Sequence, residues 1–170
     1  AVPFPFAERA GARGDIYTKK LLRHSLVNGH GSWVYWQRSN AVGPYLVMTP
    51  EGTAKFEYYD SSAGAFTPYV HAQAASAAAK AAGGNWRLPV STLRLAPKGS
   101  SGSSATYTFR FQWAKDVQGV RDVLYKEGKF DTTIVPGMVV PADLPAHISL
   151  RSRNAISAIS PEHPSATHIE

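Results

Sequence analysis

The chain has 170 residues, of which 44% are hydrophobic and 18% charged, a composition typical of one globular domain that excludes a disordered segment. It carries a net charge of +6, contains no cysteine and has no run of about eighteen apolar residues. Disulfides, zinc–thiolate sites and a transmembrane helix are therefore excluded, and no membrane partner is expected.

The first strong strand signals flank a predicted turn. Residues 1–15 are rich in Pro, Gly, Ala and charge and are predicted to be extended, whereas residues 16–27 fit a helix or an extended segment equally well. Residues 33–38 and 45–49 are rich in aromatic and β-branched side chains, and the Asn, Gly and Pro between them are turn formers. These two runs predict a β-hairpin with its turn at residues 39–44.

The predicted hairpin carries a large aromatic ring on each face. Side chains alternate between the two faces of a strand, so Trp33 and Trp36 point in opposite directions. The hairpin therefore either lies between two layers of the protein or offers one of its faces to a ligand.

The middle of the chain predicts further short elements. Residues 54–59 alternate as the third strand of an antiparallel meander, and residues 67–71 form another strand. The Ala-rich run 72–82 has high helix propensity and is followed by two glycines that end the helix. Residues 85–95 are predicted to be a strand, and the Gly- and Ser-rich run 97–104 a flexible connection.

The clearest strand signal covers residues 106–113. Aromatic rings occupy alternate positions of this run, and polar residues occupy the others. We expect the aromatic face to form core and the polar face to meet water. The four rings are those of Tyr107, Phe109, Phe111 and Trp113.

The C-terminal part predicts one more helix and several short strands. Asp116 is expected to cap a helix over residues 117–127, which Gly128 closes. Together these signals predict a mainly β fold, an antiparallel β-sandwich of super-sandwich type with one or two short inserted helices, in a single domain over residues 1–160. The remaining strands are predicted at residues 130–135, 138–140, 147–151 and 155–159, and residues 161–170 form a linker-like tail.

The sequence carries no recognisable catalytic motif. It lacks HExxH, GxSxG, Walker and GxGxxG patterns, and Ser32 lacks the glycine that follows a nucleophile serine by two places. Neither pair of neighbouring histidines has the spacing that puts two imidazoles on one helical face, so no metal site and no cofactor are expected. Glu57, Asp60 and Asp131 lie on or beside predicted strands, but the sequence nominates no catalytic pair.

The basic residues gather near the N-terminus. The cluster has no RNP-like, zinc-finger or leucine-zipper signature, so we interpret it as a solvated face and expect no nucleic-acid partner. Nucleic-acid binding is accordingly the weakest of the hypotheses. The cluster consists of Arg9, Arg13, Lys19, Lys20 and Arg23.

The predicted hairpin supports a carbohydrate-binding hypothesis. Sugars offer apolar C–H faces that stack on aromatic rings and hydroxyl groups that accept or donate hydrogen bonds. Trp33 or Trp36 flanked by Gln37, Arg38 and Asn40 would suit such a ligand. Core packing is the competing explanation for each tryptophan, although both are buried equally only if a second layer covers the hairpin.

Four segments of the chain resemble a large, poorly characterised family of bacterial and fungal proteins. These proteins are similar to six-hairpin glycosidases, in which a long β-sandwich region precedes an (α/α)6 toroid. The resemblance runs through nearly all of the 170 residues, within the sandwich region. The segments that carry it are residues 22–28, 33–45, 85–89 and 137–141.

The resemblance implies that this chain is the β-sandwich segment of a larger polysaccharide-active glycoside hydrolase. It would pack on and support a separate (α/α)6 catalytic domain of the same polypeptide, and the catalytic residues would lie outside the chain. Its partners would be that domain and an oligo- or polysaccharide, in an extracellular or periplasmic location, and residues 39–44 would lend a loop to the substrate cleft. The alternative is a free-standing carbohydrate-binding module that uses surface tryptophans.

Overall fold

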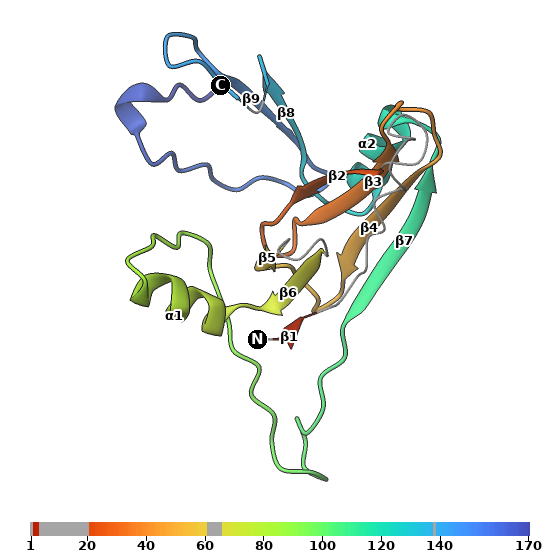
Figure 1. Ribbon diagram of the computed structural model, residues 1–170, viewed down its shortest axis with the longest axis vertical. Coiled ribbons are helices and arrows are strands. Elements are labelled where there is room, and N and C mark those ends of the chain that lie inside the picture. Colours follow the sequence, from red (N-terminus) through yellow and green to blue (C-terminus); the bar gives the residue numbers. More distant parts are fainter. Residues whose placement is uncertain (1, 4–20, 61–65, 138) are drawn as a thin grey trace, which may run out of the picture.

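The computed structural model describes residues 2–3, 21–60, 66–137 and 139–170, and their fold is mainly β, as predicted (Figure 1). All strand pairs are antiparallel. The strands are β1 (Val2–Pro3), β2 (Leu21–Leu26), β3 (Trp33–Arg38), β4 (Tyr45–Glu51), β5 (Tyr58–Asp60), β6 (Thr67–His71), β7 (Thr108–Ala114), β8 (Asp131–Val135) and β9 (His147–Arg151). The α-helices are α1 (Gln73–Ala81) and α2 (Val117–Lys126), and Pro164–Ala166 forms a 3-10 turn.

A four-stranded sheet in the order β2-β3-β4-β7 forms the centre of the molecule. The predicted hairpin is confirmed as β3 and β4, which pair with Trp36 opposite Leu46. The segment whose structure the sequence leaves open forms β2 over residues 21–26, because its backbone pairs along the whole of β3. Residues 16–20 lie outside the described part of the chain.

One face of this sheet packs against a three-stranded sheet in the order β1-β6-β5, which makes the sandwich. Trp36 of β3 meets the ring of Phe66 edge-on, with the centroids 6.3 Å apart. Phe56 stacks on Phe109 of β7 at 5.4 Å. The buried residues of this layer are Val34, Trp36, Met48, Phe56, Phe66 and Val70.

The other face of the four-stranded sheet is covered by α2. The Asp116 carboxylate accepts a hydrogen bond from the Gly119 N–H at 2.8 Å, which confirms the predicted cap. Val120 and Leu124 of α2 pack on Tyr45 and neighbouring residues of the sheet. The hairpin therefore lies between two layers, and this is the first of the two alternatives that its sequence allows.

The predicted meander is wrong, because the chain leaves the four-stranded sheet after β4. Gly52 adopts a φ of 61°, which turns the chain out of the strand. Phe56 then enters the core between the sheets, fully buried, with its backbone bridged only to Gly29. The next strand, β5, is three residues long and pairs with β6 in the opposite sheet.

The strand predicted at residues 85–95 does not form. The Ser91 N–H donates to the Glu57 carboxylate at 2.8 Å, and the Ser91 carbonyl accepts from Gln73, so neither group is available to a sheet ladder. Residues 139–140 and 155–159 are not strands either, and Met138 lies outside the described residues.

The strands β8 and β9 form a separate two-stranded sheet that projects from the sandwich (Figure 1). Their predicted positions are confirmed. The tail that follows passes through the 3-10 turn, and Glu162 pairs with Arg87 at 2.6 Å. No helix in the described part of the chain is long and apolar enough to cross a membrane.

Candidate functional site

The two tryptophans of the predicted carbohydrate site are packed inside the protein. Trp36 is 4% exposed and lies in the core between the sheets. Trp33 points to the opposite face, where its ring stacks on Tyr35 at 5.6 Å and its Nε1 donates to the Phe130 carbonyl at 2.6 Å. The fold therefore places Trp36 where a sugar has no access and holds Trp33 half-buried under α2.

The two polar residues of that predicted site lie at the β3–β4 turn and are exposed. The Asn40 Oδ1 accepts from the Val42 N–H at 3.0 Å and so stabilises the turn, in which Ala41 adopts a φ of 58°. Arg38 is the last residue of β3. The structure thus brings Arg38 and Asn40 together but does not bring them to an exposed face of Trp33 or Trp36.

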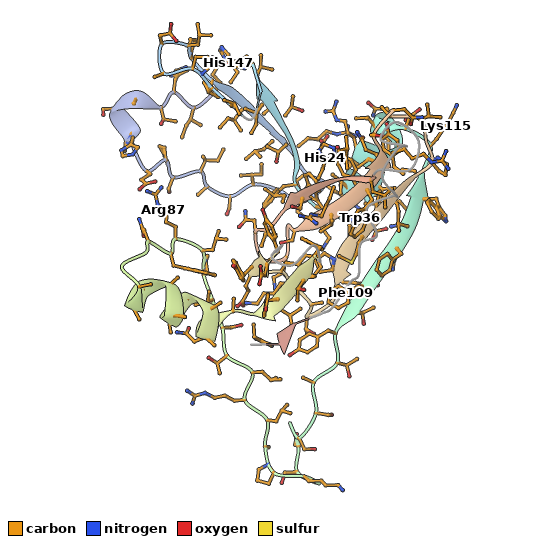
Figure 2. All side chains as sticks on the ribbon, viewed as in Figure 1. His24, Trp36, Arg87, Phe109, Lys115 and His147 are labelled. Atoms are coloured by element: carbon orange, nitrogen blue, oxygen red, sulfur yellow. The ribbon has the colours of Figure 1, made fainter. Side chains whose placement is uncertain are left out.

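An exposed tryptophan that sequence reasoning assigned to the core lies at the far end of β7. The aromatic face of this strand is covered only in part, because Tyr107 and Phe109 pack against the core between the sheets whereas Trp113 is 70% exposed. Figure 2 shows Phe109 and Lys115 toward opposite ends of the strand. The core prediction is correct for Tyr107 and Phe109 and wrong for Phe111, which is 42% exposed, and for Trp113, where the opposing sheet no longer covers the strand.

A depression of about 570 Å³ lies beside this indole and is hereafter called the Trp113 depression. The β3–β4 turn reaches β7 so closely that a Cβ on Gly43 would lie 1.9 Å from the Lys115 carbonyl oxygen. Only glycine permits this approach. Two residues of the loop predicted to reach a substrate cleft, Gly43 and Pro44, line this depression together with Trp113, Ala114 and Lys115.

A second cluster of chemically capable side chains joins β6 to the segments on either side of it. The Ser91 Oγ donates to Glu57 Oε1 at 2.5 Å and lies 2.8 Å from His71 Nδ1. His71 Nε2 lies 2.5 Å from the Tyr107 hydroxyl. Since the serine proton points to the carboxylate, Nδ1 must donate to Ser91, and Nε2 accepts from Tyr107.

This arrangement is structural rather than nucleophilic. A serine nucleophile needs its proton directed to a base that can remove it, whereas the Ser91 proton is held by a carboxylate that is itself saturated with donors. Burial by itself would raise the pKa of the Glu57 carboxyl, but hydrogen bonds from Ser91, Ala72 and Lys55 outweigh burial and lower that pKa below its ordinary value. Glu57 therefore stays ionised as an internal acceptor.

The other buried ionised groups are also satisfied within the fold. Asp131 accepts from Arg121 Nε at 2.9 and 3.2 Å, through its two oxygens. Lys129 donates to the carbonyls of His30 and Pro50 at 2.8 and 2.6 Å. Among the described residues, no group of three or more His, Asp or Glu side chains is placed to hold a metal ion.

The β8–β9 sheet presents apolar side chains to solvent. All five residues of β9 are exposed, and Ile148 is 64% exposed. The apolar surface continues into the loop between the strands, where Val139 is 88% exposed. We call the exposed apolar surface of β9 and this loop the hairpin face, and its residues are Val139, Val140, Leu144, Ile148 and Leu150. Val135 is also exposed, but it lies opposite His147 and therefore points to the other face of the sheet.

The model of a family described as a family of unknown function (DUF5695) matches residues 18–170. No curated protein and no solved structure matches the chain.

Proposed function

The chain belongs to the DUF5695 family of unknown function, and from this premise we propose that it is the β-sandwich segment of a larger polysaccharide-active glycoside hydrolase. In this role it packs on and supports a separate (α/α)6 catalytic domain of the same polypeptide. The class of enzyme and the helical partner come from the resemblance of residues 22–28, 33–45, 85–89 and 137–141. The structure contributes the surface by which the segment would dock.

The hairpin face is the observation that carries the proposal. A two-stranded sheet has little core of its own, and apolar side chains that stand in water beside one another mark a contact with other protein. Val139 and Ile148 are 88% and 64% exposed, although valine and isoleucine are among the residues most often buried. A further layer of protein over β8 and β9 would bury these side chains.

The surroundings of the two buried acids fit a segment that supports a catalytic domain and does not carry the catalytic pair itself. Glu57 lies just before β5 and Asp131 is the first residue of β8, and each is held by its own internal donors. Glycoside hydrolysis needs two carboxyl groups roughly 5 to 10 Å apart across the substrate. These two buried acids are engaged by backbone and side-chain donors of the fold, which fits a catalytic centre on another domain.

A free-standing carbohydrate-binding module is the second candidate, and Trp113 favours it. An indole that is 70% exposed beside a depression resembles the stacking platforms that bind sugars. The two candidates differ in what they predict for the hairpin face. A module that acts alone leaves this face in water, whereas a segment of an enzyme covers it.

Hydrogen exchange of the backbone amides tests the first candidate. In the natural full-length gene product we expect the β9 amides to exchange slowly, and in residues 1–170 expressed alone we expect them to exchange fast. Equal exchange in the two proteins, or a natural product that contains only this chain, would contradict the proposal.

A matched pair of substitutions adds a second test. Ile148→Ser should reduce the self-association of the isolated chain and its binding of a dye that fluoresces on apolar surfaces, because it removes apolar surface from the hairpin face. Leu95→Ser is the control, since Leu95 is 52% exposed on a different segment and its replacement should change neither. The same response from both variants would show that the hairpin face has no special role.

A further inference from the structure

We propose that the Trp113 depression is a glycan subsite, in which a pyranose ring of an oligo- or polysaccharide stacks on the Trp113 indole beside Pro44. This inference rests on the proposed function, because it takes the ligand class from a polysaccharide-active protein. It adds the location of the subsite and the residues that form it.

The exposure of Trp113 is the first observation behind the subsite. The chain has four tryptophans, and Trp36, two strands away in the same sheet, is 4% exposed whereas Trp113 is 70% exposed. Trp113 pairs with Leu46 in the ladder, so its backbone is fixed by regular hydrogen bonds. The indole is therefore held in water by the strand and is not exposed through local disorder of the strand.

The second observation is that the depression is built by rigid elements. Ala114, next to Trp113, is buried under α2 and anchors the strand from the opposite face. Gly43 brings the β3–β4 turn against the Lys115 carbonyl, and Pro44 follows as an apolar wall. A preformed site binds with a smaller entropy loss than one that must be ordered by the ligand.

The chemistry of the lining matches a sugar ring. The indole and Pro44 offer apolar surface to the C–H groups of the sugar, and the Lys115 ammonium can donate to ring hydroxyls. No residue in the described ranges forms an ion pair with Lys115. An aromatic plane with a donor at its rim is the pairing that a saccharide needs.

The size of the depression favours a sugar over a protein as its ligand. Its volume of about 570 Å³ is open to solvent, so a sugar ring would be covered on one side by the indole and Pro44 and would leave its other side in water. A stable protein interface needs about 800 Å² on each partner, and five lining residues provide much less. The depression therefore suits one or two sugar rings at the edge of the sheet.

Binding assays with a tryptophan variant test the subsite. The probes are insoluble cellulose and chitin, and soluble xylan, laminarin, mannan and polygalacturonate. We expect at least one polymer to bind the wild-type chain and to change its tryptophan fluorescence. Trp113→Ala should weaken that binding about tenfold or more, and Trp113→Phe should retain part of it, because a phenyl ring still stacks.

A control and a second subsite variant complete the assay. Leu95→Ala removes an exposed apolar side chain far from the depression and should leave binding unchanged. Lys115→Met should weaken binding severalfold by removing the donor while it keeps the stem of the side chain. Thermal melts of all variants should match the wild type, since both Trp113 and Lys115 are exposed.

The outcomes distinguish this inference from the proposed function. Absence of binding to every probe, or equal binding by Trp113→Ala, overturns the subsite even if the β9 amides are protected in the full-length protein. A variant that alters the sedimentation of the chain without any glycan binding shows that the depression contacts protein, and it also overturns the subsite. Loss of glycan binding in Trp113→Ala supports the subsite, whatever the exchange of β9 shows.

Discussion

Replacing Glu57 with glutamine should destabilise the fold in a way that depends on pH. The Glu57 side chain is almost fully buried and accepts from the Ala72 and Ser91 amides at 2.9 and 2.8 Å and from the Ser91 hydroxyl at 2.5 Å. Lys55 adds an ion pair at 2.9 Å. This one carboxylate ties the approach to β5 to the start of α1 and to the segment that leads to β7.

The size of the effect follows from which oxygen each donor uses. The Ala72 and Ser91 amides both donate to Oε2, so a glutamine oxygen in that place preserves both bonds. The glutamine NH₂ then faces the Ser91 hydroxyl, and one hydrogen bond to a charged acceptor is lost, which costs about 1.5–3 kcal/mol. Lys55 is partly exposed and can turn to water, so its ion pair adds less than about 1 kcal/mol.

We therefore expect Glu57→Gln to lower the free energy of unfolding by about 2–3 kcal/mol at pH 7, which corresponds to a Tm decrease of roughly 4–12 °C for a chain of this size. The pKa of the Glu57 carboxyl is lowered in the folded state from its ordinary value of 4.5. Its contribution to stability is therefore fully present above that value and is lost as the pH falls through the lower, folded-state pKa.

Urea denaturation followed by tryptophan fluorescence, between pH 7 and pH 3, measures both features. The gap between wild type and Glu57→Gln should be constant from pH 7 to about pH 5.5 and should narrow below pH 4.5. Glu162→Gln is the matched control, because Glu162 pairs with Arg87 at an exposed position and should contribute less than about 1 kcal/mol. A gap below about 0.5 kcal/mol at pH 7, or one that does not narrow in acid, refutes the reasoning.

Four further substitutions test the packing of the fold. Trp36→Ala should cost about 3–5 kcal/mol of unfolding free energy in urea titrations, whereas Trp113→Ala should cost less than about 1 kcal/mol; similar costs would contradict their assigned burial. Lys129→Met should cost about 2–3 kcal/mol, because it leaves the carbonyls of His30 and Pro50 without a donor, and a melting temperature equal to the wild type would disprove this. Gly43→Ala should cost about 1–3 kcal/mol and weaken glycan binding, because its Cβ would lie 1.9 Å from a backbone oxygen; unchanged binding would show that the turn does not shape the depression.

Elements specified by local signals were predictable from the sequence. The β3–β4 hairpin follows from turn formers between two strand-forming runs, and the start of α2 follows from Asp116, whose side chain bonds three residues ahead. The positions of β6, β8 and β9 likewise follow from short strand-forming runs bounded by glycine or proline. Each of these signals acts within a few residues and does not depend on the rest of the fold.

The candidate site was not predictable, because it depends on contacts between distant segments. Alternation shows that Phe109 and Trp113 share a face of β7, but it does not show where the opposing sheet ends. The role of Glu57 depends on Ser91, 34 residues later, and the same contact removes Ser91 from a strand that its neighbours favour. The residue types therefore indicated that aromatic rings could bind a sugar, but they did not show which of these rings are exposed to solvent.

Helix α2 connects the two surfaces that carry the proposals. It begins directly after the Trp113 depression and ends before β8, and its ten residues span roughly 15 Å. Arg121 of α2 binds Asp131 of β8, and Arg151 of β9 lies 4.5 Å from the centre of the Tyr125 ring of α2, so the hairpin face is fixed to the helix.

Under the two proposals, this connection would link substrate binding to docking. A catalytic domain seated on the hairpin face would be held at a set distance from a sugar stacked on Trp113, because α2 packs on the sheet that carries the indole. Such a segment would hold a polysaccharide chain in register with a catalytic centre on its neighbour.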